Sequence, residues 1–389
     1  MAVNNPGGLA WIIFSWVSNP WVTPLLMFLG AFILMFFVGT PLIDWLRHKH
    51  WRKDQPEAET WTVREDTPET HQAKQGTPSM GGIGLIGSAC LTFIALVSTG
   101  AILGLLTRSV RGVTGGPTWL QLLGGVLLPP LTVLAFTGLG FTDDWSKASG
   151  RGGLSARAKF VAQVGLALGF VGAFALLTFY QSYLGVRFVY PALFAGGAAF
   201  LPVLLGIIAM LIVTTSNAVN LTDGIDGLAA GLAVQVGLAL WIGGTFVAPF
   251  EVSYFSNMLW MALAGASLGF LVYNHYPARV FMGDTGSLAL GAALGMGAVL
   301  AHATFLLPFI GFMYFVEMFS VMLQVSYFKW TKRKTGEGKR IFRRAPLHHH
   351  YELGGWSEWR VVMVFWAINL LTTCVGLYLW AMNFLPHWP

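Results

Sequence analysis

Long uncharged runs alternate along the chain with shorter segments that are rich in charge. Four runs contain no Asp, Glu, Lys or Arg: residues 80–107, 160–186, 227–250 and 361–389. Each is longer than the roughly 20 apolar residues that an α-helix needs to cross a bilayer. Transmembrane β-strands would instead alternate polar and apolar positions over about 10 residues, and these runs do not. The pattern therefore predicts an all-α integral membrane protein.

Read with the breaks between them, the apolar runs predict about ten transmembrane helices. The eighth and ninth helices are expected to be separated, or the ninth kinked, at Pro308, because proline removes a backbone donor and clashes with the preceding turn. The whole chain, residues 1–389, is expected to form one polytopic membrane domain. The expected helices lie near residues 22–46, 80–106, 119–141, 157–180, 200–217, 227–248, 256–274, 285–303, 305–328 and 359–384.

The composition agrees with a membrane location. The chain is 55% hydrophobic and 10% charged, whereas soluble domains carry about 25% charged residues. A soluble domain is therefore excluded, the lipid bilayer is the expected surrounding, and no nucleic-acid partner is expected. The two cysteines, Cys90 and Cys374, both fall in predicted helices and form no CxxC motif, so they indicate packing rather than a disulfide framework.

The basic residues predict the orientation of the helices. Of the 23 Lys and Arg residues, 20 fall on alternate connecting segments, mainly 47–78, 147–159 and 329–360. In membrane proteins an excess of positive charge marks the cytoplasmic loops. We therefore expect these segments to be cytoplasmic and both termini to lie on the outer face. Two cytoplasmic loops are long: 47–78, which carries a charged insertion, and 329–357, which carries three consecutive histidines.

The acidic residues indicate where a functional site lies. Only Glu251, of the 17 carboxylates, maps to the outer face. A carboxylate within the hydrocarbon region costs about 2.5–3.5 kcal/mol on insertion scales, so those near helices are functional candidates. Their position predicts one shared site at the cytoplasmic interface, although Asp44 is equally well explained as solvated. The candidates at cytoplasmic helix ends are Asp44, Asp143, Asp144, Asp223, Asp226, Asp284 and Glu317.

The stretch GFTDDWSK, residues 140–147, ends the third apolar run. Its adjacent carboxylates, Asp143 and Asp144, repel each other unless a cation lies between them. Mg²⁺ prefers carboxylate oxygens and substrate phosphates, so it is the expected cation. Lys147 and Lys159 lie in the basic segment that follows and are candidate contacts for an anionic substrate.

The stretch SNAVNLTDGIDGLAAG, residues 216–231, combines amides, acids and glycines. Polar side chains recur every three residues, so neighbouring members point in similar directions on a helix. An ordinary capped turn would not need four of them, and we expect this segment to bind substrate. The recurring residues are Asn217, Asn220, Asp223 and Asp226, and Gly224 and Gly227 then open the backbone before the next helix.

The stretch RVFMGDTGS, residues 279–287, opens the eighth helix and contains Asp284. The free N–H groups at a helix start favour phosphate, and a bridging Mg²⁺ would reconcile the aspartate with that anion. Phe281 lies beside the site. Its ring is suited either to stacking on a base or to anchoring at the membrane interface, where aromatic residues are common.

The stretch KQGTPSMGG, residues 74–82, leads into the second helix. The Gly-Thr-Pro sequence and the glycine pair predict a rigid turn, with Lys74 as a cation at its base. The alternative is a plain turn whose lysine reaches toward the headgroups.

The stretch RRAPLHHHYELGG, residues 343–355, contains His348, His349 and His350. Consecutive residues diverge by about 100° on a helix and alternate on a strand, so the three rings do not easily meet at one zinc ion. The neighbouring arginines favour contact with phosphate or diphosphate, or proton transfer near neutral pH.

Together these five motifs, in their order along the chain from Lys74 to Glu352, resemble the polyprenyl-phosphate N-acetylhexosamine-1-phosphate transferase family, and within it the branch that acts on UDP-MurNAc-pentapeptide. The resemblance implies transfer of phospho-MurNAc-pentapeptide from UDP to undecaprenyl phosphate in a bacterial inner membrane, giving lipid I and UMP. It also implies a Mg²⁺ requirement and a homodimer.

The resemblance further implies roles for individual residues. Asp284 matches the direct Mg²⁺ ligand, with Asp143 and Asp144 nearby, and Asp143 matches a residue proposed to deprotonate the lipid phosphate. Phe281 matches the uridine pocket, which favours the stacking role. The other matches are Lys74, Asn220, Asp223 and His348–His350 in the active site, Gly224, Ile225 and Asp226 in the uridine pocket, and Pro308, Glu317 and Gln324 beside a groove for the lipid tail.

Alternatives remain at this level. Asp143 is suited to act as a base, as a positioning group or, in a two-step scheme, as a nucleophile. A transferase that uses UDP-GlcNAc or a similar sugar would carry much the same motifs. An ion-coupled transporter would place its carboxylates near the bilayer midplane on broken helices, whereas here they gather at one face.

Overall fold

A computed structural model describes residues 22–50, 76–111, 122–183, 201–247, 252–301, 304 and 306–384. Within these residues the regular structure is entirely helical. The helices are α2 (Val22–His50), α4 (Gly82–Arg111), the short π-helix η1 (Leu122–Leu127), α6 (Leu128–Ala148), α7 (Ala156–Tyr183), α9 (Leu201–Thr222), α10 (Leu228–Val247), α11 (Val252–Asn274), α12 (Gly283–Leu300), α13 (Leu307–Ile310), α14 (Phe312–Thr335), α15 (Leu347–Glu352) and α16 (Glu358–Phe384).

The expected all-α membrane class is confirmed. Every segment predicted to be a transmembrane helix overlaps helical structure; the third predicted segment overlaps η1 and α6, and the ninth overlaps α13 and α14. Five helices in the described part of the chain are long and apolar enough to cross a bilayer: Val22–His48, Gly82–Thr99, Ala156–Leu177, Leu201–Thr222 and Glu358–Met382. The number of ten spans and the orientation stay predictions.

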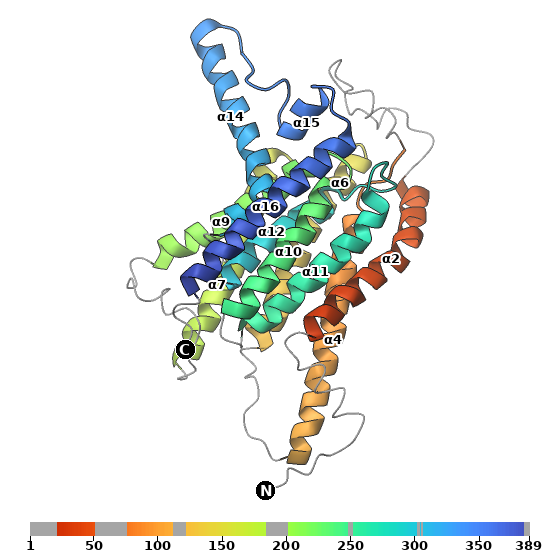
Figure 1. Ribbon diagram of the computed structural model, residues 1–389, viewed down its shortest axis with the longest axis vertical. Helices are drawn as coiled ribbons and strands as arrows, with labels where there is room; N and C mark the ends of the chain where they lie inside the picture. Colours follow the sequence, from red (N-terminus) through yellow and green to blue (C-terminus); the bar gives the residue numbers. More distant parts are fainter. Residues whose placement is uncertain are drawn as a thin grey trace.

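The helix α12 lies at the centre of the bundle. All of its residues from Thr285 to Leu300 are buried, and it packs against α4, α6, α9, α10 and α11. Its sequence is rich in glycine and alanine, which lets neighbouring helix backbones approach closely. Figure 1 shows α16, α10, α11 and α2 side by side across one face. The N-terminus of α12, where Asp284 lies, is therefore held by the rest of the bundle.

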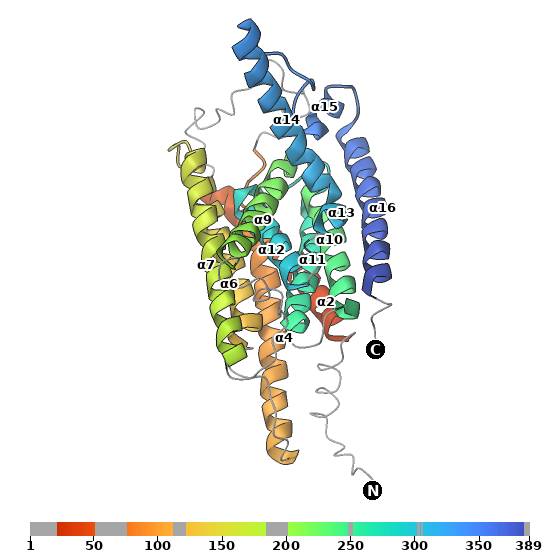
Figure 2. The ribbon, with the colours of Figure 1, turned by 90° about the vertical axis from the view of Figure 1, so that its left-hand side faces the viewer.

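The predicted break near Pro308 is present and lies at Gly311, between α13 and α14. Asn369 of α16 is fully buried beside it. Its Oδ1 accepts a hydrogen bond from the Met313 N–H at 3.2 Å, and its Nδ2 donates to the Ile310 carbonyl at 3.2 Å. Beyond the break, α14 extends past the bundle at the end where α15 lies (Figure 2).

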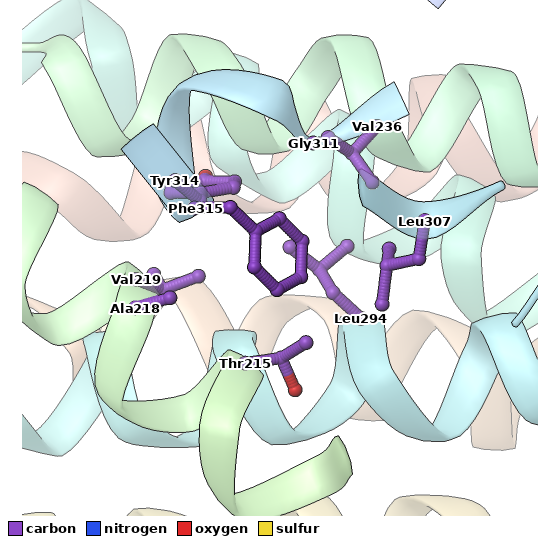
Figure 3. Close-up of a pocket in the computed structure, with 9 residues that line it drawn as sticks. All are labelled: Thr215, Ala218, Val219, Val236, Leu294, Leu307, Gly311, Tyr314 and Phe315. Carbon is purple, nitrogen blue, oxygen red and sulfur yellow. The ribbon is translucent and has the colours of Figure 1, made fainter. Parts of the chain in front are cut away.

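A small apolar void adjoins the same break. Figure 3 shows the Phe315 ring of α14 among Leu294, Leu307 and Thr215. Its volume of about 10 Å³ is near the lower limit for one water molecule, and a water also needs polar partners. This void is therefore part of the packed core and is not the functional site.

Candidate active site

The polar motifs meet at one end of the bundle, the end at which α15 and the start of α16 lie (Figures 1 and 2). The segment before α4 pairs with the segment before α12: the Phe281 N–H donates to the Pro78 carbonyl at 2.8 Å, and the Gly81 N–H donates to the Phe281 carbonyl at 2.9 Å. These bonds join two motifs that are about 200 residues apart in sequence. Phe281 is partly exposed at this junction.

Two lysines and two aspartates form a compact charged cluster, which we call the lysine–aspartate cluster: Asp143, Lys147, Lys159 and Asp284. Lys147 Nζ lies 2.9 Å from Asp143 Oδ2 and 2.9 Å from Asp284 Oδ2. Lys159 Nζ lies 3.2 Å from Asp143 Oδ2 and also contacts Asp284 Oδ2. The Asp143 side chain is 2% exposed and that of Lys147 is 44% exposed. The cluster thus reaches from the protein interior to solvent.

Close helix packing makes this cluster possible. At Gly140 of α6, an added Cβ would lie 2.0 Å from the Asp284 carbonyl oxygen of α12. Only glycine permits that approach, so α6 and α12 bring Asp143 and Asp284 together. Asn220 of α9 completes the arrangement, because its Nδ2 donates to Asp284 Oδ1 at 2.5 Å and to Ser287 Oγ at 2.9 Å.

Asp144 faces the N-terminus of α12. Its Oδ1 accepts from the Asp284 N–H at 3.1 Å, and its Oδ2 accepts from the Thr285 N–H at 2.8 Å and the Thr285 hydroxyl at 2.6 Å. The expectation that these first amides are free for phosphate is therefore wrong. A carboxylate is favourable at the positive end of a helix, but no sequence pattern indicated that this one would come from α6.

The two asparagines of the 216–231 stretch have different surroundings. Asn220 joins the lysine–aspartate cluster, whereas Asn217 Nδ2 donates to Gln163 Oε1 of α7 at 2.8 Å. Asn217 therefore packs α9 against α7. Gln163 was not foreseen as a partner, since nothing in its apolar surroundings marks it out. Asp223 lies in the loop after α9, where burial, followed by the charges of Asp284 and Asp144, raises its pKa well above the usual range.

The loop 223–227 connects α9 to α10 and packs against α15. An added Cβ on Gly224 would lie 2.4 Å from His348 Nε2, so this contact requires glycine. Ile225 and Asp226 are buried. Asp226 Oδ2 accepts a hydrogen bond from the Ala278 N–H at 2.9 Å, which ties the loop to the segment that leads to Phe281.

The three consecutive histidines have three different partners. His348 is fully buried, with its Nδ1 3.3 Å from Glu317 Oε2. His349 Nδ1 lies 2.9 Å from Glu352 Oε2. His350 Nδ1 accepts from the Arg343 N–H at 3.1 Å. The His348 and His349 rings lie 4.1 Å apart between centroids, but the Nδ1 atoms of the three histidines contact three separate groups.

Burial governs the charge state of His349. It lowers the pKa of His349 to about 4, although the hydrogen bond that the Glu352 carboxylate accepts has the opposite effect. The charges of His348 and Arg344 lower the pKa further. The ring is therefore neutral near pH 7.

Two residues matched to the lipid groove have structural partners. Glu317 is fully buried, and its Oε1 accepts from the His348 N–H at 3.1 Å. Gln324 Oε1 accepts from the Ile341 and Phe342 N–H groups at 2.9 and 3.1 Å. Both side chains therefore hold the segment 341–348, which follows α14 in sequence, against that helix. Lys74 and the insertion at 54–73 lie outside the described residues.

The carboxylates of the site could hold Mg²⁺ only as a small ligand set. In the part of the chain that the structure describes, no group of three or more His, Cys, Asp or Glu side chains could hold a metal ion. Two carboxylates, Asp143 and Asp284, do share the same two ammonium groups. A site of two carboxylates fits Mg²⁺, which keeps several waters and also binds substrate phosphates.

The fold and this site define a helical membrane protein with a charged, phosphate-compatible site at one end of its bundle. Residues 126–302 match the family model described as Glycosyl transferase family 4. Proteins named phospho-N-acetylmuramoyl-pentapeptide-transferase are similar over most of their length. The one from Synechococcus sp. is 39% identical over 90% of this chain and 89% of its own. Those from Moorella thermoacetica and Bacillus subtilis are 40% and 38% identical, over 90% and 91% of this chain and 96% and 97% of their own.

The chain therefore belongs to the phospho-N-acetylmuramoyl-pentapeptide-transferase family. This confirms the family resemblance that was inferred from the five motifs.

Proposed function

We propose that the chain transfers phospho-MurNAc-pentapeptide from UDP-MurNAc-pentapeptide to undecaprenyl phosphate, forming lipid I and releasing UMP. The observation that carries this proposal is the lysine–aspartate cluster, in a chain whose relatives bear the name of that transferase. Both substrates carry phosphate, so their reaction brings anions together. Catalysis of such a transfer consists mainly of positioning and charge stabilisation.

The residues of the cluster are suited to this task. Lys147 and Lys159 present ammonium groups that would offset the charge of the two phosphates. Asp143 and Asp284 would hold Mg²⁺ in the same region, and Asn220 would fix the Asp284 carboxylate. When bound, Mg²⁺ would screen the repulsion between the diphosphate and the incoming phosphate.

The contacts of Asp143 favour positioning over nucleophilic attack. Its Oδ1 accepts a hydrogen bond from the Leu154 N–H at 2.6 Å, while its Oδ2 contacts both lysines. A nucleophile would need one oxygen free and aimed at phosphorus. The acceptor phosphate is itself an ionised nucleophile near pH 7, so a base has little to contribute. We therefore favour a one-step transfer in which Asp143 orients the lysines.

The groove along α14 suits the acceptor's tail. It has a volume of about 540 Å³ and an almost wholly apolar lining, with Val316, Phe319, Met322 and Leu323 on α14 and Phe342 and Leu347 on the returning chain. A polyprenyl chain would fill it and remain in contact with lipid.

We further propose that the active site faces the cytoplasm of a bacterium, in a ten-span inner-membrane protein with both termini outside. The chain would act as a homodimer.

The test is release of UMP by purified protein in detergent. Release should require UDP-MurNAc-pentapeptide, undecaprenyl phosphate and Mg²⁺ together. UDP-GlcNAc serves as the competing donor. Turnover of UDP-GlcNAc in place of the pentapeptide donor would overturn the proposed substrate, and UMP release without the lipid acceptor would overturn the proposed reaction.

A further inference from the structure

The loop 223–227 is held by a buried carboxylate from the far end of the sequence. Glu358, in the first turn of α16, is 3% exposed. Its Oε1 accepts a hydrogen bond from the Asp226 N–H at 2.6 Å. A buried backbone N–H needs a partner, and the Glu358 carboxyl group supplies one to Asp226. Glu358 therefore fixes the middle of this loop to α16.

The same loop is also fixed to the segment before α12. The Gly227 N–H donates to Asn274 Oδ1 at 3.1 Å, and Asn274 Nδ2 donates to the Val280 carbonyl at 2.9 Å. Asp226 Oδ2 accepts from the Ala278 N–H. The loop and the segment that carries Phe281 thus form one hydrogen-bonded unit, and Glu358 is its link to α16.

The start of α16 holds the histidine helix as well. The Tyr351 ring of α15 lies 4.8 Å from the Trp356 ring and 5.9 Å from the Phe365 ring, measured between centroids. Further along α16, Trp366 Nε1 donates to the Leu228 carbonyl at 3.2 Å. One helix therefore sets the position of α15 and of the loop 223–227, which meet where Gly224 packs on His348.

We propose that Glu358 is a positioning residue for the nucleotide: it holds the 223–227 loop in the conformation that receives the uridine of the UDP substrate. This rests on the proposed function, which supplies the uridine nucleotide as ligand, and on the uridine pocket that the family resemblance implies at Gly224, Ile225 and Asp226. The Glu358 carboxyl group binds the loop at the Asp226 N–H, so the effect of its loss falls on nucleotide binding. The groove proposed for the acceptor lipid is lined by residues of α14 together with Phe342 and Leu347, and its lining includes neither Glu358 nor the loop 223–227.

The experiment compares Glu358→Ala with Glu358→Gln in the full-length chain. Removing the acceptor leaves the Asp226 N–H unpaired, so Glu358→Ala should weaken UMP binding and raise the KM for UDP-MurNAc-pentapeptide by about 10-fold. The KM for undecaprenyl phosphate and kcat should change less than about 2-fold, because the cluster is intact. Glu358→Gln keeps an acceptor oxygen at the same distance and should restore most of the affinity for UMP.

Glu337→Ala is the matched control. It removes a carboxylate from an exposed position after α14 and should leave all of these values unchanged. Thermal unfolding of each variant separates loss of nucleotide affinity from loss of fold. Unchanged UMP affinity in Glu358→Ala, equal rises in both KM values, or failure of Glu358→Gln to restore UMP binding would each overturn the proposal. Because UMP binding is measured without turnover, these outcomes are distinct from failure of the proposed reaction, which would appear in the unsubstituted chain.

Discussion

Two of the polar clusters in the part of the bundle that the structure describes differ in charge and in surroundings. The lysine–aspartate cluster lies at the end of the bundle and carries four charges, with Lys147 and Lys159 partly exposed. The second, which we call the amide cluster, lies at the break between α13 and α14 and consists of Asn369, Gln235 and Thr373. Asn369 is 0% exposed and the cluster is neutral.

The difference shows what each cluster is built to do. In the amide cluster, Asn369 and Thr373 both donate to the Ile310 carbonyl, and Asn369 Nδ2 also donates to Gln235 Oε1 at 2.9 Å. These bonds satisfy backbone groups that the break leaves without helical partners. In the lysine–aspartate cluster the ammonium and carboxylate groups bond mainly to one another, so a phosphate or cation can replace those partners. Buried neutral amides hold the architecture, and charges that water can reach are available for chemistry.

The largest expected effect is that of Asp284→Asn. This change removes a charge that both lysines contact, while it keeps the shape of the side chain. UMP release should fall by about 100- to 1,000-fold, as on loss of one electrostatic group at a reacting phosphate. The helical content and the unfolding temperature in detergent should stay close to those of the unsubstituted chain. Substantial residual release would contradict the role of Asp284 in the proposed Mg²⁺ site.

Lys159→Met should have the next largest effect. Lys159 contacts Asp143 and Asp284, so its loss removes one of the two fixed positive charges and should lower kcat about 30-fold. Arg157→Met is the matched control, because Arg157 is an exposed basic residue two positions earlier on α7. Equal effects of the two substitutions would show that only the general positive charge of this surface matters.

The sequence predicted the lysine–aspartate cluster better than the amide cluster. Asp143, Asn220 and Asp284 were identified because charged and amide residues beside apolar runs are costly to bury, so their presence indicates a function. Their meeting depends on Gly140 and on the packing of α6 against α12, which no local pattern specifies. The helix positions followed from the apolar runs alone.

The contacts of polar residues inside the apolar runs were not predicted from the sequence. Asn369 and Gln163 lie inside such runs, and only the three-dimensional structure shows which backbone or side chain each one meets. Glu358 precedes the last run and gave no more signal than any acidic residue at a helix start. Asp144 was expected to lie near the metal, and its contacts with the first amides of α12 depend on the same unpredictable packing.

Asn369→Leu tests the architectural role of the amide cluster. Leucine has a similar size but leaves the Met313 N–H unpaired and breaks the bond to Ile310, so the free energy of unfolding should fall by about 1–2 kcal/mol. Thr372→Val is the matched control, because Thr372 donates only to carbonyls of its own helix. Thermal unfolding in detergent measures both. Loss of UMP release without a change in stability would contradict the distinction between the two clusters.

The smallest expected effect concerns His349. Like the residues of the lysine–aspartate cluster it is titratable, but like those of the amide cluster it is neutral, because it is buried. Its pKa of about 4 in the folded chain is below the value of about 6.5 for an exposed histidine. As the pH falls, the unfolded chain takes up this proton before the folded chain does. The contribution of neutral His349 to the free energy of unfolding is therefore complete above pH 6.5 and is lost toward pH 4. Between pH 7 and pH 6 the free energy of unfolding should fall by about 0.7 kcal/mol.

The comparison of the unsubstituted chain with His349→Gln isolates that contribution. Glutamine does not titrate, so its unfolding temperature should depend less on pH between 7.5 and 6 than that of the unsubstituted chain. Identical pH dependence in the two chains would mean that His349 is solvated and free to carry a proton. It would then belong with the charged groups of the lysine–aspartate cluster, and the histidine stretch would regain the proton-transfer role that its sequence allows.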